Sequence, residues 1–134
     1  MSERALLFRH AGQHFSLPAS VGREAFVPTH LMPLPGGQGA LLGLTEVRGL
    51  AVPLLNLSAL IGNTMPPEVP ELALLLEIHG ELLALPAQHV VGLLPRGDVP
   101  TSTELLTEPS QVGDLTARHI RPAALLDAVR RLIS

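Results

Sequence analysis

Apolar and polar residues alternate in short runs along much of the chain. Phe15 and Leu17 flank Ser16, and Leu50, Val52 and Leu54 fall on one face of an extended segment. Twelve Gly and 13 Pro interrupt the apolar runs before these reach the length of an ordinary helix. The pattern therefore predicts a mainly β fold, with strands near residues 4–10, 13–18, 24–28, 41–48, 50–55, 72–79, 81–85, 90–95, 112–119 and 119–126.

Two short helices are also predicted. Asn56 can cap the amides that follow it, and Gly62 can end the helix. The second helix lies at the C-terminal end, where apolar residues recur at helical spacing: Leu125 or Leu126, Val129, Leu132 and Ile133. Its start is open, because propensity places it after Pro122 whereas the repeat described next places it after Asp127.

The chain contains an internal repeat. Displaced by 68 positions, residues 6–19 align without a gap with residues 74–87, and six of 14 positions are identical, Gly12/Gly80 among them. A later match sets Leu54-Leu55-Asn56 against Leu125-Leu126-Asp127, at an offset of 71. Each half is small for a core of its own, so we expect two small barrels packed together. The predicted boundaries are a first barrel at about 1–62, a connecting segment at 63–70 and a second barrel at about 71–134.

Composition removes several classes of function. All nine basic residues are Arg, there is no Cys, and the aromatics are three Phe, which excludes lysine and thiolate chemistry and leaves little for stacking on bases. A net charge of -3 without a basic run argues against a nucleic-acid partner. The longest apolar stretch, Leu72–Leu76, is too short to span a bilayer, and the start of the chain is too short of apolar residues for a signal peptide. We expect no membrane insertion and a cytoplasmic protein.

Candidate reactive groups are few. His10, His14 and His79 lie near predicted turns, but no carboxylates accompany them in a metal-site pattern, so surface histidines are the better interpretation. Gly36-Gly37-Gln38-Gly39 lacks the following Lys of a phosphate cradle and is expected to be a loop. No Gly-x-Ser-x-Gly elbow is present. We predict no catalytic residue, no metal and no cofactor, and therefore no enzyme.

One segment resembles the signature of CheW-like domains. It runs Leu41-Leu42-Gly43-Leu44-Thr45-Glu46-Val47-Arg48-Gly49-Leu50-Ala51-Val52-Pro53-Leu54-Leu55-Asn56-Leu57, with a strand glycine, an Arg-Gly turn and an alternating strand that contains Pro. Phe8 with Phe15-Ser16-Leu17 is similar to the family's opening hairpin, Leu34-Pro35 to its Leu-Pro, and Leu125-Leu126-Asp127 with Leu132 to its closing element. The resemblance covers nearly the whole chain as a single CheW-like domain, 1–134, and implies two packed SH3/OB-like barrels of five strands.

The resemblance implies a non-catalytic adaptor that couples chemoreceptors to a CheA-type histidine kinase, in chemotaxis or pilus-driven motility. By carry-over, the partner-binding residues are Val21, Gly43, Arg48 and Gly49. The chemoreceptor's cytoplasmic tip would bind in the groove between the barrels, and the kinase regulatory domain at exposed strand ends and turns. Asn56 stands where the family usually has Asp, which is equivalent if the residue only caps a helix.

Structural roles for the same residues stay open at this point. Arg48 can be a solvated turn residue before Gly49, and Gly43 can mark a bulge or a close backbone approach. The alternative function is a CheW-fold protein that has lost these partners and binds a small ligand or metal, or associates with itself.

Overall fold

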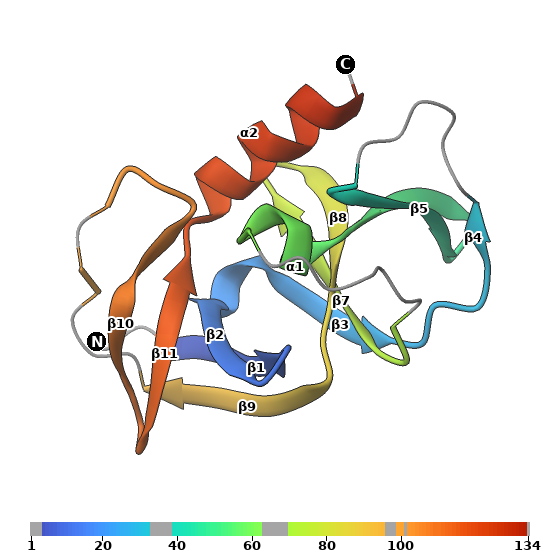
Figure 1. Ribbon diagram of the computed structural model, residues 1–134. Coiled ribbons are helices and arrows are strands. Elements are labelled where there is room, and N and C mark those ends of the chain that lie inside the picture. Colours follow the sequence, from blue (N-terminus) through green and yellow to red (C-terminus); the bar gives the residue numbers. More distant parts are fainter. Residues whose placement is uncertain (1–3, 33–38, 63–69, 96–98, 101, 134) are drawn as a thin grey trace.

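The computed structural model describes residues 4–32, 39–62, 70–95, 99–100 and 102–133 (Figure 1). Leu34-Pro35, residues 36–38 of the glycine-rich loop and residues 63–69 of the connecting segment lie outside this described part. The strands are β1 (Arg4–His10), β2 (Gln13–Pro18), β3 (Gly22–Phe26), β4 (Leu31–Met32), β5 (Leu41–Val47), β6 (Leu50–Leu55), β7 (Ala73–Ile78), β8 (Glu81–Pro86), β9 (His89–Pro95), β10 (Leu106–Val112) and β11 (Leu115–Ile120). The helices are the 3-10 turn η1 (Ala19–Val21), α1 (Leu57–Leu60) and α2 (Pro122–Ile133).

The mainly β fold with a C-terminal helix is confirmed, and most of the predicted strands lie within two residues of observed ones. Of the last two predicted strands, 112–119 overlaps β11 but starts too early, and 119–126 is wrong; β10 was not predicted. Gly113, with φ +60°, forms a turn inside the first of them, between β10 and β11. The second is replaced by α2, which begins at Pro122, because proline lacks only an N–H that the first helical turn would leave unpaired.

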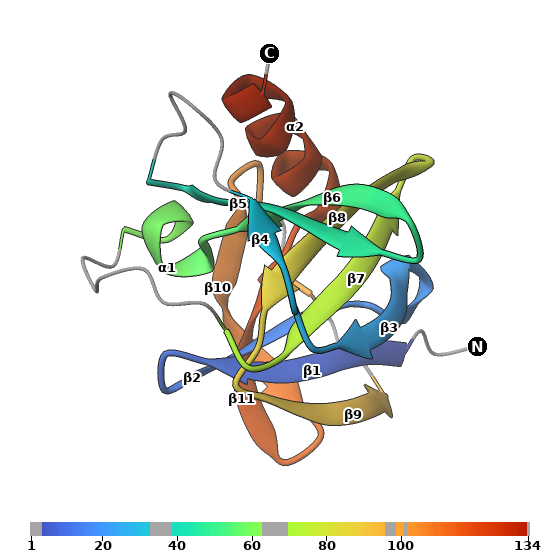
Figure 2. The ribbon, with the colours of Figure 1, turned by 90° about the vertical axis from the view of Figure 1, so that its right-hand side faces the viewer.

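The eleven strands form two sheets, and each sheet takes strands from both halves of the chain. Sheet A has the order β10-β11-β2-β1-β9, and sheet B has the order β3-β7-β8-β6-β5-β4. Figure 2 shows the hairpin β1–β2 beside β9, below β3 and β7. Barrels made of residues 1–62 and 71–134 are therefore not what the pairing shows, since the two halves exchange their first hairpins. The described pairings also leave both sheets with free edges.

The repeat itself is present in the structure, but its second part has a different offset. β5, β6 and α1 begin at Leu41, Leu50 and Leu57, and β10, β11 and α2 begin 65 residues later in each case, at Leu106, Leu115 and Pro122. The match of Leu54-Leu55-Asn56 with Leu125-Leu126-Asp127 is thus wrong, because the first pair of Leu lies in β6 and the second in α2. Apolar Leu pairs serve a strand and a helix face equally well, so the letters alone could not separate them.

A large cluster of buried side chains lies between the sheets and the helices. Phe8 and Phe15, paired across β1 and β2, have ring centroids 5.8 Å apart. Helix α2 contributes Leu125, Leu126 and Val129 to this cluster, and these residues recur at the spacing of one helix face. Arg130 on α2 bonds Glu81 at the start of β8 at 2.8 Å, which ties the helix to the hairpin of its own half. In the described residues, no helix is both long and apolar enough to cross a membrane.

Candidate partner-binding site

The predicted Arg-Gly turn connects β5 and β6. Val47 pairs with Leu50, and the two residues between them have φ angles of +52° (Arg48) and +82° (Gly49), as a two-residue hairpin turn requires. Ala11-Gly12 and His79-Gly80 form the same turn, with φ of +51° and +76°, and of +51° and +79°. Because Ala11 and His79 share the conformation of Arg48, this backbone angle belongs to the turn and is not a mark of a binding site.

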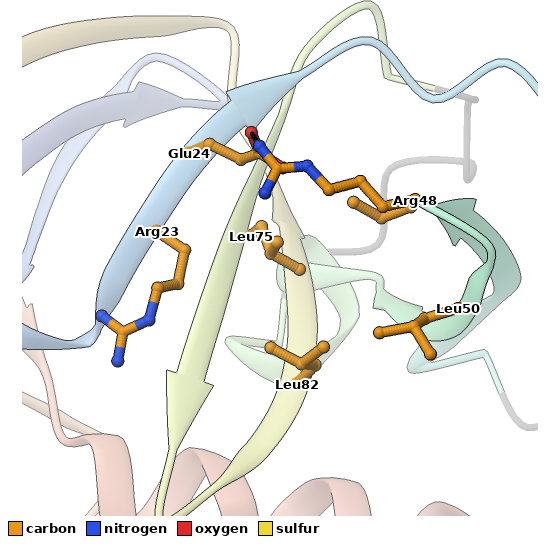
Figure 3. A pocket seen from close by; sticks show the side chains of 7 residues that line it. Arg23, Glu24, Arg48, Leu50, Leu75 and Leu82 are labelled. Atoms are coloured by element: carbon orange, nitrogen blue, oxygen red, sulfur yellow. Dashed lines mark hydrogen bonds and ion pairs between the residues drawn. The ribbon is translucent and has the colours of Figure 1, made fainter.

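The side chain of Arg48 distinguishes this turn from the other two. Its Nη2 donates to Glu24 Oε2 on β3 at 2.7 Å (Figure 3). β3 is the edge strand of sheet B, so the contact reaches over β7 and β8. The Arg48 side chain is 79% exposed and that of Glu24 is 29% exposed. An ion pair this exposed contributes little to stability and is readily broken, so both charges are available to a partner.

An apolar hollow of about 250 Å³ lies beneath this ion pair. Leu50, Leu75 and Leu82 project into it from β6, β7 and β8 (Figure 3). Leu50 is 55% exposed, which is unusual for a large apolar residue in a strand. The walls also include Val47 and the charged residues Arg23, Glu24 and Arg48.

A second hollow of about 240 Å³ lies on the other side of β3, between the two sheets. Leu6 of β1 and Val90 and Leu93 of β9 line it from sheet A, and Leu74 and Leu75 line it from sheet B. Arg23, Glu24 and Leu75 line both hollows, so the two adjoin along β3. We call the pair of hollows the β3 groove. Leu93, which is 51% exposed, lies on the rim of this groove.

The charged rim of the groove carries a second ion pair. Arg23 Nη2 donates to Glu77 Oε2 at 2.5 Å, and Arg23 Nη1 donates to the carbonyls of Ser20 and Gly22 at 3.1 and 3.2 Å. Arg23 is therefore held in place by η1, by its own strand and by β7. The β3 groove thus combines an apolar floor with two exposed ion pairs, a composition that suits a partner with apolar and charged groups on one face.

The structure does not gather all four predicted site residues. Arg48 lines the groove, whereas Gly49 lines a separate hollow with Thr29, Met32 and Ala51. Val21 ends η1 and packs against the large core cluster. The sequence did not predict Leu50, Leu75 or Leu82 as site residues. The available signal was Leu50, a large apolar residue directly after the turn, where a polar residue is expected.

Gly43 has a steric role. It lies at a register shift of β5 with φ +149°, and a Cβ built there would be 2.6 Å from the Met32 carbonyl oxygen of β4. No L side chain fits at that distance, so Gly43 is what allows β4 to pair with β5. This agrees with the close backbone approach that the sequence left open.

A buried serine and histidine lie side by side in sheet A. Ser16 Oγ and His119 Nδ1 are 3.2 Å apart, and Thr107 Oγ1 accepts the His119 backbone N–H at 3.1 Å. All three residues are buried, so the serine hydroxyl has no access to a substrate in solution. The contact joins β2 to β11 at the short parallel pairing of these strands. Within the described ranges, no three His, Asp or Glu side chains are placed to hold a metal ion.

Comparison with known proteins agrees with this architecture. Residues 4–127 match the family model of the CheW-like domain, and the chain therefore belongs to this family. The scaffolding protein TtCheW from Thermoanaerobacter tengcongensis has a similar fold, with 17% identity, coverage of 90% of both chains and a TM-score of 0.77. No curated protein matches the sequence. Membership of the family supports a scaffold or adaptor role in chemotaxis signalling.

Proposed function

We propose that this chain is a non-catalytic adaptor that couples chemoreceptors to a CheA-type histidine kinase. The observation that carries the proposal is the β3 groove, two adjoining apolar hollows along β3 with exposed ion pairs on their rim. Membership of the CheW-like family supports the choice of a chemoreceptor and a CheA-type kinase as the two partners. Binding, and not reaction chemistry, is the activity that such a groove supports.

The receptor's cytoplasmic tip is the proposed occupant of the groove. An amphipathic helix would lay its apolar face over Leu50 and Leu93, which are about half exposed in the free chain. Covering the exposed half of a leucine side chain stabilises a complex by roughly 1 kcal/mol. Arg48 would exchange Glu24 for a carboxylate of the receptor, which costs little because the existing pair is exposed.

The kinase regulatory domain is proposed to bind at exposed strand ends and turns, away from the groove. Simultaneous binding of both partners would then raise the local concentration of kinase at the receptor. Val21, Gly43 and Gly49 remain predicted contact residues. Since Val21 packs into the core and Gly43 has a steric role, we expect both to act on binding through the shape of the neighbouring strands.

Titration of the purified chain with a receptor tip fragment and with the kinase regulatory domain of the same organism tests the proposal. We expect saturable binding of both, and a loss of receptor affinity of about tenfold in Arg48→Glu, the factor that about 1.4 kcal/mol represents. Arg131→Glu, at an exposed position of α2, is the matched control and should bind normally. Far-UV circular dichroism verifies that both variants are folded.

Two results would contradict this function. The absence of any association with receptor or kinase would contradict the adaptor role. Equal losses of receptor affinity in Arg48→Glu and Arg131→Glu would contradict the groove as the receptor site. A thermal-shift screen and size-exclusion chromatography on the same sample distinguish the alternatives, because a stabilising small ligand or metal, or a self-associated species, would favour the fold without these partners.

A further inference from the structure

Three basic side chains form a row across sheet A. Arg9 of β1 pairs directly with His14 of β2 on one side and with His89 of β9 on the other. Residues that are paired directly across neighbouring strands project from the same face of a sheet, so the three side chains lie next to one another. Arg9 and His89 are exposed and His14 is partly exposed. We call this set the His14–Arg9–His89 row.

The Arg9 side chain has no counter-ion, unlike three other arginines of the described chain. Arg23, Arg48 and Arg130 each bond a carboxylate of the chain. Across the part of the chain that the structure describes, the side chains of Arg9, His14 and His89 have neither an ion pair nor a hydrogen bond. The Arg9 guanidinium is therefore an unneutralised positive charge, flanked by two imidazoles without partners, on a chain whose net charge is -3.

The row is separate from the β3 groove. Leu6, which lines the groove, pairs with Leu93, and side chains alternate between the two faces along β1. Arg9 therefore shares its face with Leu7, and Leu7 is covered by Val112 and Ala117 of the β10–β11 hairpin. The row therefore lies on the face of sheet A that is opposite to the groove, next to the end of this small apolar cluster. A partner in the groove would leave it accessible.

The spacing of the row suits several separate carboxylates. Neighbouring strands are about 4.8 Å apart, so the row is roughly 10 Å long. An extended peptide presents alternate side chains about 7 Å apart, so two carboxylates on one of its faces fit within the length of such a row. Arg9 supplies a planar guanidinium that can bind a carboxylate with two parallel hydrogen bonds, and the imidazole N–H groups of His14 and His89 can donate to further carboxylates. One compact phosphate would instead favour converging donors or a cradle of backbone N–H groups.

We propose that the His14–Arg9–His89 row binds an acidic segment of a partner protein. The contact is electrostatic, is made on the face opposite the β3 groove, and depends on Arg9 as its central charge. It stands independently of the receptor and kinase assignments, because neither partner enters the argument.

An NMR titration of the isotope-labelled full-length chain tests the row directly. The probe is a hexaglutamate peptide at pH 6.5 and low ionic strength, and a hexaglutamine peptide controls for chain length. We expect saturable shifts of the imidazole signals of His14 and His89 with hexaglutamate alone. Arg9→Gln should weaken the affinity about fivefold, the effect of losing one charge-assisted contact. Arg4→Gln changes the same net charge at the other, exposed end of β1 and should leave the affinity unchanged.

Three outcomes would overturn the proposal. Equal losses in Arg4→Gln and Arg9→Gln would mean that net charge alone is sensed. Shifts of similar size with hexaglutamine would mean that the peptide backbone is the ligand. Displacement of hexaglutamate by inorganic phosphate, added at the same total concentration of negative charge, would mean that the row binds small anions and not an acidic peptide. His89→Gln provides a second variant at an exposed edge position, and a loss of affinity there would support the row independently of Arg9.

Discussion

Replacement of Gly43 by alanine is expected to destabilise the fold by about 2–6 kcal/mol. Two costs combine at this position. A non-glycine residue at a φ of +149° carries a conformational strain of about 1–3 kcal/mol. The new methyl group would also lie 2.6 Å from the Met32 carbonyl oxygen and 3.1 Å from Leu31 Cδ1, and a forced backbone shift of this kind typically costs about 1–3 kcal/mol.

Gly12→Ala is the matched control. Gly12 has a φ of +76°, and a Cβ added there would have no neighbour within 4 Å. This substitution therefore carries strain without a clash and should cost about 1 kcal/mol. The difference in unfolding free energy between the two variants therefore measures the cost of the steric clash between β5 and β4.

Urea denaturation followed by far-UV circular dichroism measures this difference, since the chain has no Trp or Tyr for fluorescence. With an m-value of about 2 kcal/mol/M, a difference of about 2 kcal/mol separates the two midpoints by about 1 M. Coincident midpoints would refute the steric argument. If the prediction holds, weaker partner binding in a Gly43 variant must be compared with its stability before Gly43 is assigned a direct contact.

Two further predictions concern polar contacts at the start of α1. Asn56→Asp keeps the oxygen that accepts the Ala59 N–H but removes the amide that donates to the Gly39 carbonyl at 3.0 Å. Losing this hydrogen bond should lower the free energy of unfolding by about 1 kcal/mol, measured by urea denaturation. Unchanged stability would mean that Asn56 only caps the helix. Burial lowers the pKa of the His10 imidazole, whose Nε2 lies 2.9 Å from Ser58 Oγ. The contribution of the neutral imidazole to stability is therefore complete above about pH 6.5 and is lost as the pH falls through the lowered pKa of the folded state. His10→Gln should therefore show a smaller loss of stability between pH 7.5 and pH 5 than the native chain, whereas the exposed His30→Gln should not; parallel curves for all three would contradict this.

The sequence predicted local elements better than their pairing. The hairpins at Gly12, Gly49 and Gly80 were predictable because alternation and a turn glycine are both local signals. The exchange of hairpins between the sheets was not, since a repeat shows which segments are alike and not which segments pair. The strand predicted at 119–126 was misassigned because Leu125 and Leu126 fit a strand or a helix face until Pro122 sets the helix start.

The turn residues of the candidate site could be predicted from the sequence, whereas the apolar residues that line the groove could not. Arg48 and Gly49 carry a motif that can be seen in the sequence, and the structure places Arg48 on the groove. Glu24 lies 24 positions earlier in the chain, and Leu75 and Leu82 come from the hairpin of the other half. Contacts between such distant segments depend on the exchanged pairing, so no local pattern could reveal them.

The exchanged hairpins also set the order in which the protein can fold as it is synthesised. Sheet B has all its strands once β8 ends at Pro86, whereas sheet A is complete only after β11 ends at Ile120. The β1–β2 hairpin, which carries Phe8, Phe15 and Leu17, is synthesised before the other strands of both sheets, whereas its partner strand β11 is synthesised after all of them. Nascent chains with uncovered apolar strands are prone to aggregate or to require chaperones. The interval between the synthesis of β2 and that of β11 is thus the period in which this protein is most exposed to misfolding.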